Sequence, residues 1–155
     1  MDTSQSQRKE NGGVFRSHRV LRHPPERVFE AFADSERLAR WWGPDGFTNT
    51  FEVFEFRDGG RWKYVMHGPN NAHLRNESVF LEVKVPSAVV IHHVSKPRYT
   101  LRIILTARAG GTAIEWAQEF EEEKVADRIR HIVEPANEQN LNRLEALLAG
   151  GESGS

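Results

Sequence analysis

Six strand-like segments, separated by short turn sequences, occupy the middle of this chain. The turn sequences are Asp58-Gly59-Gly60, 69–72, Pro86-Ser87, Lys96-Pro97 and Gly110-Gly111. Each has the length of a hairpin loop, about two to five residues, so each strand should pair with the next one in an antiparallel sheet. The predicted strands are 47–56, 61–68, 73–85, 88–94, 99–109 and 112–120.

Two short helices are predicted after a first strand at residues 14–22. Pro24-Pro25-Glu26 opens the first helix, because proline fits a first turn and glutamate suits the positive end of the helix dipole. The second helix, at 35–42, begins at an Asp34/Ser35 cap and ends before a Gly-Pro pair. Trp41-Trp42 at its end are interpreted either as core anchors or as guards of a cavity mouth.

A long helical pattern closes the chain. Apolar side chains recur at helical spacing between Val125 and Leu148. Pro135 lacks a backbone donor and disfavours helix at the residue before it. We therefore expect a short helix before Glu134 and a longer one that restarts at Pro135.

Loop lengths assign each strand residue to one face of the sheet. Four-residue loops set His92 opposite Leu101 and Tyr64 opposite Glu77. In segment 47–56 the alternation of apolar residues breaks, which predicts a β-bulge. The predicted apolar face carries Trp62, Tyr64, Met66, Val79, Leu81, Val83, Val90, Val94, Leu101, Ile103, Leu105, Ile114, Trp116 and Phe120.

This apolar face needs a cover, and the C-terminal helix has the only long apolar stripe to supply it. The expected fold is α+β: a curved antiparallel sheet of six to seven strands that grips a long helix, with two short helices after the first strand. One domain should span 14–149, between a disordered arm at 1–13 and a flexible tail at 150–155.

Composition excludes several classes of protein. The 155 residues include no cysteine, which excludes disulfide scaffolds, cysteine-ligated metals and a thiol nucleophile. The net charge of −1 gives no general attraction to nucleic acid or to anionic membranes. No apolar run reaches the roughly 18 residues of a membrane span, so we expect no membrane insertion. The lack of cysteine fits a reducing compartment, so we expect a cytoplasmic location.

No cofactor and no metal are predicted. The chain lacks the phosphate-binding glycine loops and the common catalytic motifs. His92 and His93 are adjacent on a strand and point to opposite faces, so they cannot share a metal. His67 and His73 flank one loop and are expected to come close, but no Asp or Glu has the spacing to complete a site.

A set of motifs spread over nearly the whole domain resembles one family. They are Pro24-Pro25-Glu26-Arg27-Val28-Phe29, Trp41-Trp42-Gly43-Pro44, Gly46-Phe47-Thr48, Arg57-Asp58-Gly59-Gly60-Arg61-Trp62, Met66-His67-Gly68-Pro69-Asn70, Asn76-Glu77, Gly110-Gly111-Thr112 and 139–144. With the order of elements, they resemble the helix-grip fold of the START-like (SRPBCC) superfamily, in the branch named after the activator of the heat-shock-protein-90 ATPase. Pro135 departs from the family pattern, in which this helix is usually unbroken.

The resemblance implies a hydrophobic cavity between the sheet and the last helix. It does not imply one function, because members look like lipid carriers, hormone receptors, polyketide cyclases and co-chaperones. We expect the cavity to bind a small hydrophobic or amphipathic molecule. The alternatives are a cavity enzyme, similar to a polyketide cyclase or hydrolase, and a co-chaperone-like module whose partner is a chaperone.

The candidate ligand-binding residues are those that the predicted register directs into this cavity. They are Trp62, Tyr64, Met66, Glu77, His92, Ile103, Trp116, Gln118, Phe120 and Leu144. Glu77 and His92 are the only candidates for acid–base catalysis. The alternative interpretation is structural: Glu77 pairs with Arg75, His92 is an ordinary buried histidine, and Gln118 bonds to the helix. No activated nucleophile is evident, so an enzyme is the less favoured hypothesis.

Overall fold

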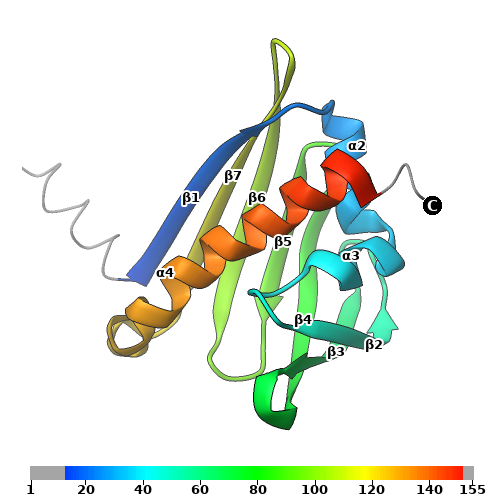
Figure 1. Cartoon of the computed structure of the whole chain (residues 1–155). Coiled ribbons are helices and arrows are strands. Elements are labelled where there is room, and N and C mark those ends of the chain that lie inside the picture. The colour runs from blue at the N-terminus through cyan, green and yellow to red at the C-terminus, as the bar shows by residue number, and fades with distance from the viewer. Residues whose placement is uncertain (1–12, 152–155) are drawn as a thin grey trace, which may run out of the picture.

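A computed structural model describes residues 13–151 of the chain (Figure 1). The predicted arm, apart from Gly13, and the tail from residue 152 lie outside the described residues. The elements are β1 (Val14–Leu21), α2 (Pro25–Ala33), α3 (Ser35–Trp41), β2 (Thr48–Phe54), β3 (Arg61–Gly68), η1 (Pro69–Asn71), β4 (Ala72–Lys84), β5 (Ala88–His93), β6 (Tyr99–Arg108), β7 (Gly111–Phe120), α4 (Glu123–Ala146) and η2 (Leu147–Gly151).

All seven strands form one antiparallel sheet in the order β1-β7-β6-β5-β4-β3-β2. The long helix α4 runs diagonally across one face of this sheet, and α2 and α3 pack at one end (Figure 1). The predicted α+β helix-grip architecture is confirmed. The predicted bulge in β2 is present as well, between Phe51 and Val53. Within residues 13–151, no helix is both long and apolar enough to span a membrane.

The last helix is continuous, so the predicted break at Pro135 is wrong. α4 runs from Glu123 to Ala146 with Pro135 inside it. Proline deprives the carbonyl group four residues earlier, that of His131, of its helical partner. Both Pro135 and His131 are exposed, so water can hydrate that carbonyl group and the helix tolerates the proline.

Strand β4 presents the opposite face from the one predicted as far as Phe80. A bulge between Phe80 and Glu82 then returns Val83 to the predicted apolar face. The β3–β4 turn has three residues, in which Asn70 and Asn71 take left-handed φ values of 62° and 60°. Because this turn is one residue shorter than expected, Tyr64 pairs with Asn76 rather than with Glu77. A slip of one residue sends every side chain to the other face, so Asn76 faces α4 and Glu77 faces away.

Strand β5 is reversed for a related reason. Its loop to β6 is one residue longer than predicted, so His93 pairs with Tyr99 and His92 with Thr100. His93 is buried on the face under α4, with 3% of its surface exposed. His92 lies on the outer face, where its Nε2 is 3.1 Å from Oε2 of Glu121. The prediction that His92 points into the cavity is therefore wrong.

Strands β6 and β7 keep their predicted faces although their pairing differs by two residues, with Ile103 opposite Trp116. Gly110 ends the loop between them with a φ of 79°. Gly111 already belongs to β7, and a Cβ atom there would lie 2.0 Å from the carbonyl oxygen of Leu21. Gly111 thus permits the close approach of β1, and a shift of two residues preserves the apolar face.

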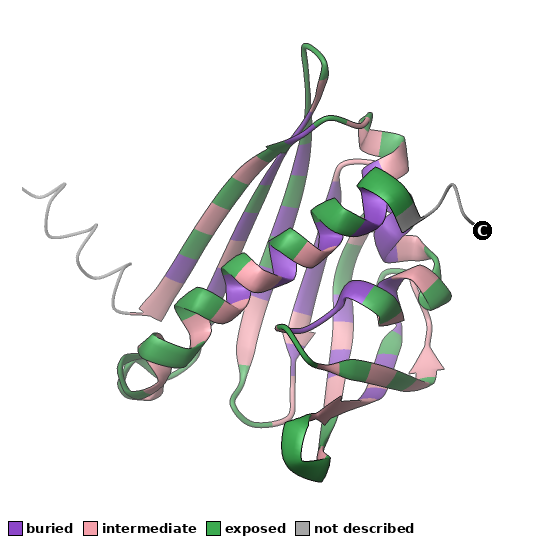
Figure 2. Ribbon diagram, in the orientation of Figure 1, coloured by how far each residue is buried: buried purple, intermediate pink, exposed green. Residues whose placement is uncertain are grey.

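Aromatic rings fill the space between the sheet and the short helices. The ring of Trp42 lies 5.1 Å from that of Trp62 and 5.8 Å from that of Trp116. Trp62 also stacks on Phe80 at 5.6 Å. Trp41 and Trp42 are 1% and 5% exposed, so both are core residues. Figure 2 shows the buried stripe of α4 turned toward the sheet.

Candidate functional site

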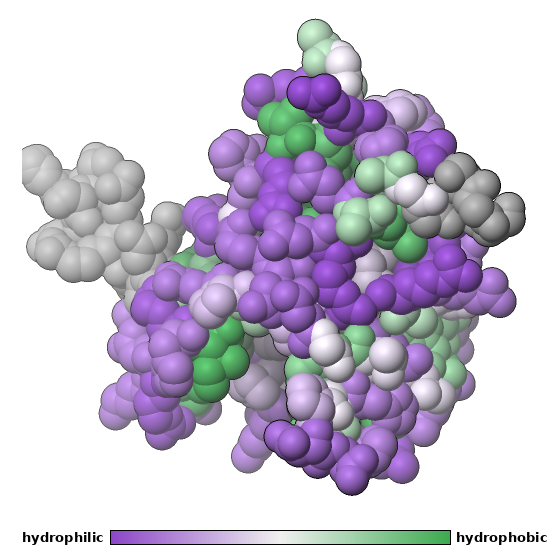
Figure 3. Space-filling model, in the orientation of Figure 1, coloured by the Kyte–Doolittle hydropathy of each residue, from purple (hydrophilic) through white to green (hydrophobic). Residues whose placement is uncertain are grey.

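Between the middle of α4 and the sheet, a cavity of about 120 Å³ remains open. The strands contribute Tyr64, Met66, Asn76, Tyr99, Leu101, Trp116 and Gln118 to its lining. The helices and the α3–β2 loop contribute Trp42, Gly43, Pro44, Ala136, Asn137 and Asn140. On the same side, Figure 3 shows the surface hollowed between the first half of α4 and the loop that carries η1, with hydrophobic surface along one edge.

Two asparagines of α4 bring amide groups to the cavity. Asn137 donates from Nδ2 to Oε1 of Gln118 at 3.0 Å, and both side chains are buried. Asn140 donates to the carbonyl oxygen of Trp41 at 2.7 Å and accepts from the backbone N–H of Gly43 at 3.2 Å. These bonds hold α4, β7 and the α3–β2 loop together around the open space.

Two aromatic side chains of the lining, Trp42 and Tyr64, contact each other. Trp42 donates from Nε1 to the hydroxyl oxygen of Tyr64 at 3.3 Å. Burial raises the pKa of Tyr64 to about 12, because removing the phenolate from water disfavours the charged form. Burial also raises the pKa of Tyr99, the second tyrosine of the lining. Both phenol groups are therefore neutral at physiological pH.

Two indole N–H groups are buried without a hydrogen-bond partner among residues 13–151. They belong to Trp62 and Trp116. Trp116 lines the cavity, whereas Trp62 lies behind it, stacked on Tyr64 with a centroid distance of 4.3 Å. A buried donor that lacks an acceptor costs about 1–3 kcal/mol. Both nitrogen atoms are enclosed by neighbouring atoms, so each carries this cost within the packed interior.

Behind Asn76, a buried histidine supports the cavity wall. The ring nitrogens of His93 lie 2.7 Å from Oδ1 of Asn76 and 2.8 Å from the carbonyl oxygen of Pro97. Its ring stacks on Tyr99 at 4.5 Å. Burial lowers the pKa of His93, because a charged imidazolium is poorly solvated there. His93 itself does not line the cavity, so its role is to position Asn76 and Tyr99.

Four of the predicted ligand-binding residues line the cavity: Tyr64, Met66, Trp116 and Gln118. Four more lie in the apolar core beside it: Trp62, Ile103, Phe120 and Leu144. The other two, Glu77 and His92, lie on the outer face. The predicted pairing of Gln118 with the helix is present as its bond to Asn137.

Sequence reasoning missed the asparagines of the lining. Asn137 and Asn140 stand three residues apart and share a helix face with the buried Leu141 and Leu144. Polar residues inside an apolar helical stripe were the signal that could have found them. Asn76 was hidden by the error in register, because its neighbour Glu77 was assigned to its place.

One arginine of α4 holds the loop that follows Trp41-Trp42. The guanidinium group of Arg143 donates to the carbonyl oxygens of Arg40, Trp42, Gly43, Pro44 and Phe47 at 2.7–3.3 Å. Gln139 accepts from the backbone N–H of Asp45 at 3.1 Å. These contacts join the Trp-Trp-Gly-Pro motif to the motif at 139–144 and fix one rim of the cavity.

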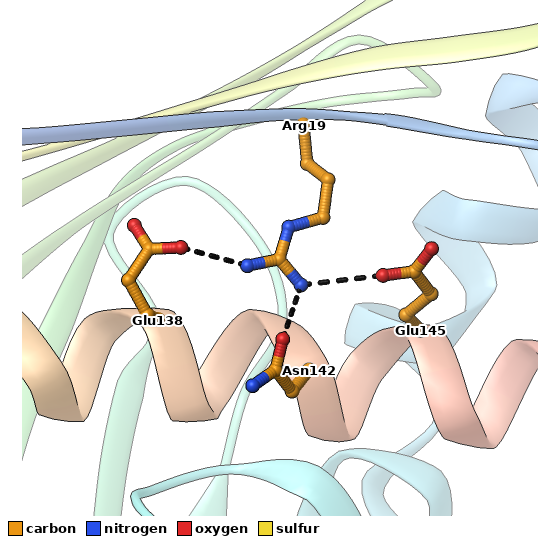
Figure 4. A network of polar contacts seen from close by, with 4 residues as sticks. All are labelled: Arg19, Glu138, Asn142 and Glu145. Carbon is orange, nitrogen blue, oxygen red and sulfur yellow. Dashed lines mark hydrogen bonds and ion pairs between the residues drawn. The ribbon is translucent and has the colours of Figure 1, made fainter.

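A second arginine ties the other side of α4 to the sheet (Figure 4). Arg19 of β1 reaches toward α4, where its guanidinium lies 2.7 Å from Glu138, 2.7 Å from Asn142 and 3.2 Å from Glu145. The two carboxylates are about half exposed, so each ion pair contributes little to stability. The network chiefly orients α4 over β1.

The two histidines beside η1 do meet. Nδ1 of His67 lies 2.7 Å from Nδ1 of His73, and Nε2 of His67 lies 2.8 Å from the hydroxyl oxygen of Thr50. Among residues 13–151, however, no group of three potential metal ligands comes together. A hydrogen bond between the two rings accounts for the contact.

Comparisons with solved structures agree with this architecture. A crystal structure of a protein from Chromobacterium violaceum has 26% identity and a TM-score of 0.77, over 86% of this chain and 96% of that one. A crystal structure from Nitrosomonas europaea has 19% identity and a TM-score of 0.82, over 91% and 97%. The AHSA1 protein of Silicibacter pomeroyi has 20% identity and a TM-score of 0.70, over 88% and 97%. A search of curated proteins gave no match.

A family model described as "Activator of Hsp90 ATPase homolog 1-like protein" matches residues 22–149. This match covers α2 to α4 and includes every residue that lines the cavity. The chain therefore belongs to the family of activator of Hsp90 ATPase homolog 1-like proteins.

Proposed function

We propose that this protein binds a small hydrophobic or amphipathic molecule in the cavity between the sheet and α4. The observation that carries the proposal is a space of about 120 Å³ whose walls combine aromatic rings with a few amide groups. Such a mixture is typical of small-molecule sites, because apolar walls supply affinity and sparse polar groups fix orientation.

The outward positions of the two predicted acid–base residues weaken the enzyme alternative. Glu77 pairs with Lys63 on the outer face, and His92 lies beside Glu121. No residue of the cavity lining carries a carboxylate or an imidazole. Binding without a reaction is therefore the better proposal.

Contact with a chaperone is the other alternative, and the description of the family is its support. The two proposals make different demands on the molecule. A chaperone would contact the surface, so substitutions inside the cavity should not affect its binding. A small ligand requires the cavity itself to be open.

The test is a titration of isotope-labelled protein with small aromatic and amphipathic compounds, followed by backbone amide NMR shifts. At least one compound should bind at millimolar affinity or better, and its shift changes should cluster on the lining. Ala136→Leu would project a larger side chain from α4 into the cavity and should reduce this affinity at least about tenfold. Ala146→Leu makes the same change at an exposed position of α4 and should leave it unchanged.

Two results would contradict the proposal. One is a set of shift changes confined to the outer face of the sheet or to exposed loops. The other is a binding affinity that Ala136→Leu and Ala146→Leu alter equally, since the ligand would then not occupy the space beside Ala136.

A further inference from the structure

We infer that the cavity selects an uncharged molecule with about the size of one substituted ring that carries both a hydrogen-bond donor and an acceptor, and that Asn137 and Gln118 recognise these two groups. This inference rests on the proposed function and narrows it to a chemical class. Small aromatic amides belong to that class, whereas hydrocarbons and carboxylates do not.

The contact between Asn137 of α4 and Gln118 of β7 leaves one donor and one acceptor unused. A single hydrogen bond, from Nδ2 of Asn137 to Oε1 of Gln118, joins the two amides. Each amide has an oxygen acceptor and an NH₂ donor, so Nε2 of Gln118 and Oδ1 of Asn137 remain without a partner among residues 13–151. Exchanging the oxygen and nitrogen of both amides reverses the bond but again leaves one donor and one acceptor.

These two unused atoms are accessible to a molecule in the cavity. Both residues line it, and only 8% of Gln118 and 9% of Asn137 are exposed. Within residues 13–151, the polar side-chain atoms that are enclosed without a partner belong to other residues. Nε2 of Gln118 and Oδ1 of Asn137 therefore keep accessible surface, unlike the indole nitrogen of Trp116, and this surface faces the space that the two residues line.

The absence of charge follows from the lining. None of its residues is a lysine, arginine, histidine, aspartate or glutamate, and its two tyrosines are neutral. A carboxylate moved from water into such a space loses its hydration without meeting a cation, which is strongly unfavourable. A neutral amide loses much less hydration and gains hydrogen bonds to both members of the pair.

The size follows from the volume. A cavity of about 150 Å³ in another protein holds one benzene molecule, and the cavity here has about 120 Å³. The surface is hollowed on the same side (Figure 3), which leaves room for part of the molecule to extend outward. A single ring with one small group is therefore the scale of ligand that this space accepts.

Four compounds of equal heavy-atom count separate these properties. Benzamide carries a donor and an acceptor, acetophenone only an acceptor, α-methylstyrene neither, and benzoate a charge. Each is titrated into the wild type and into the double variant Gln118→Met/Asn137→Leu, which replaces both amides by apolar side chains of similar size and leaves neither partner unpaired. The hydration of each free compound is the same in both titrations, so the change in relative affinity reports the contacts with the pair.

The preference for benzamide should depend on the two amides. Its affinity relative to α-methylstyrene should fall at least about tenfold in the double variant, because the ligand amide then loses its hydration without gaining partners. For acetophenone, which can use only the donor, the fall should be smaller, about threefold. In the wild type at neutral pH, benzoate should bind at least about a hundredfold more weakly than benzamide.

Asn142→Leu is the matched control. It makes the same substitution at an exposed position of α4 outside the lining and should leave the relative affinities unchanged. The side-chain NH₂ signals of Gln118 and Asn137 report the contact in the wild type: benzamide should move one of them downfield, as expected when it begins to donate a hydrogen bond, and α-methylstyrene should not. If the double variant fails to fold, this shift decides.

The outcomes separate the inference from the function on which it rests. Relative affinities that the double variant leaves unchanged, with the compounds perturbing the lining, would overturn the inference and leave the proposed function standing. Tighter binding of benzoate than of benzamide would also overturn it, as would binding by other small compounds but by none of these four. No binding by any compound, including the wider panel, would overturn both.

Discussion

The space between the sheet and its helices has two parts that are built differently. Near α2 and α3, the rings of Trp41, Trp42, Trp62 and Phe80 pack against one another at centroid distances of 5.1–5.6 Å. Near the middle of α4, amide side chains lie among the rings and a cavity of about 120 Å³ stays open. Apolar side chains close-pack because every gap loses contacts. Amides bonded to fixed partners do not close the gap in this way.

This difference indicates how one fold can combine stability with binding. The aromatic part should carry most of the stability and tolerate little change. The amide-lined part should contribute less stability and determine which ligand binds. Three predictions test this division, in order of decreasing expected effect.

The largest loss of stability is expected in the aromatic part. Trp62→Ala removes a fully buried ring that contacts Trp42, Tyr64 and Phe80. The free energy of unfolding should fall by about 3–5 kcal/mol, as measured by urea titration. Asn137→Ala, which removes one hydrogen bond from the amide-lined part, should cost only about 1 kcal/mol. Equal losses for the two variants would mean that the parts do not differ as described.

An intermediate effect is expected at the rim that joins the two parts. Arg143→Ala removes the guanidinium donor from five backbone carbonyl oxygens. Those of Trp42 and Pro44 keep a second donor. The loss should be about 2–3 kcal/mol, typical of bonds to a charged group in a partly buried place. Arg143→Lys keeps the charge but loses the forked geometry. Its melting temperature should therefore lie between those of Arg143→Ala and the wild type. Full recovery by lysine would show that charge alone holds the loop.

The smallest effect is expected at His93, beside the amide-lined part, where the free energy of unfolding should depend on pH. Burial lowers the pKa of His93 below its ordinary value of 6.5. Just below pH 6.5, the unfolded chain therefore binds more protons than the folded protein, and the free energy of unfolding falls as the pH decreases. His93→Phe, which retains a ring against Tyr99, should flatten this dependence between pH 7 and pH 5, measured by urea titration at each pH. If the free energy of unfolding of His93→Phe depends on pH as steeply as that of the wild type, groups other than His93 cause the dependence.

The fold could be predicted because the sequence marks the turns with glycine, proline and asparagine and marks the buried face of the sheet with alternating apolar residues. The faces of β3, β6 and β7 are as predicted, so Tyr64, Met66, Trp116 and Gln118 line the cavity. The predicted faces were wrong for β5 and for β4 as far as Phe80, because one loop is a residue shorter and the other a residue longer than expected. Asn70 and Asn71 both adopt left-handed conformations, which asparagine tolerates more readily than most residues, so this pair was the available signal for a shorter turn.

The remaining errors in the site have similar local causes. His93 was assigned to the outer face, because the loop from β5 to β6 is one residue longer than expected. Pro135 was expected to end a helix, and its exposed position instead lets water replace the missing bond. Asn137 and Asn140 could have been found from their spacing alone, since both fall in the apolar stripe of α4.

The central claim is that the amide-lined space is open and binds a small molecule. A crystal structure of the protein with a compound that binds in the NMR titration tests it most directly. We predict density for the compound in the cavity beside Ala136. A cavity closed by the side chains of its lining, or one that holds only water while the compound lies elsewhere, would contradict this account.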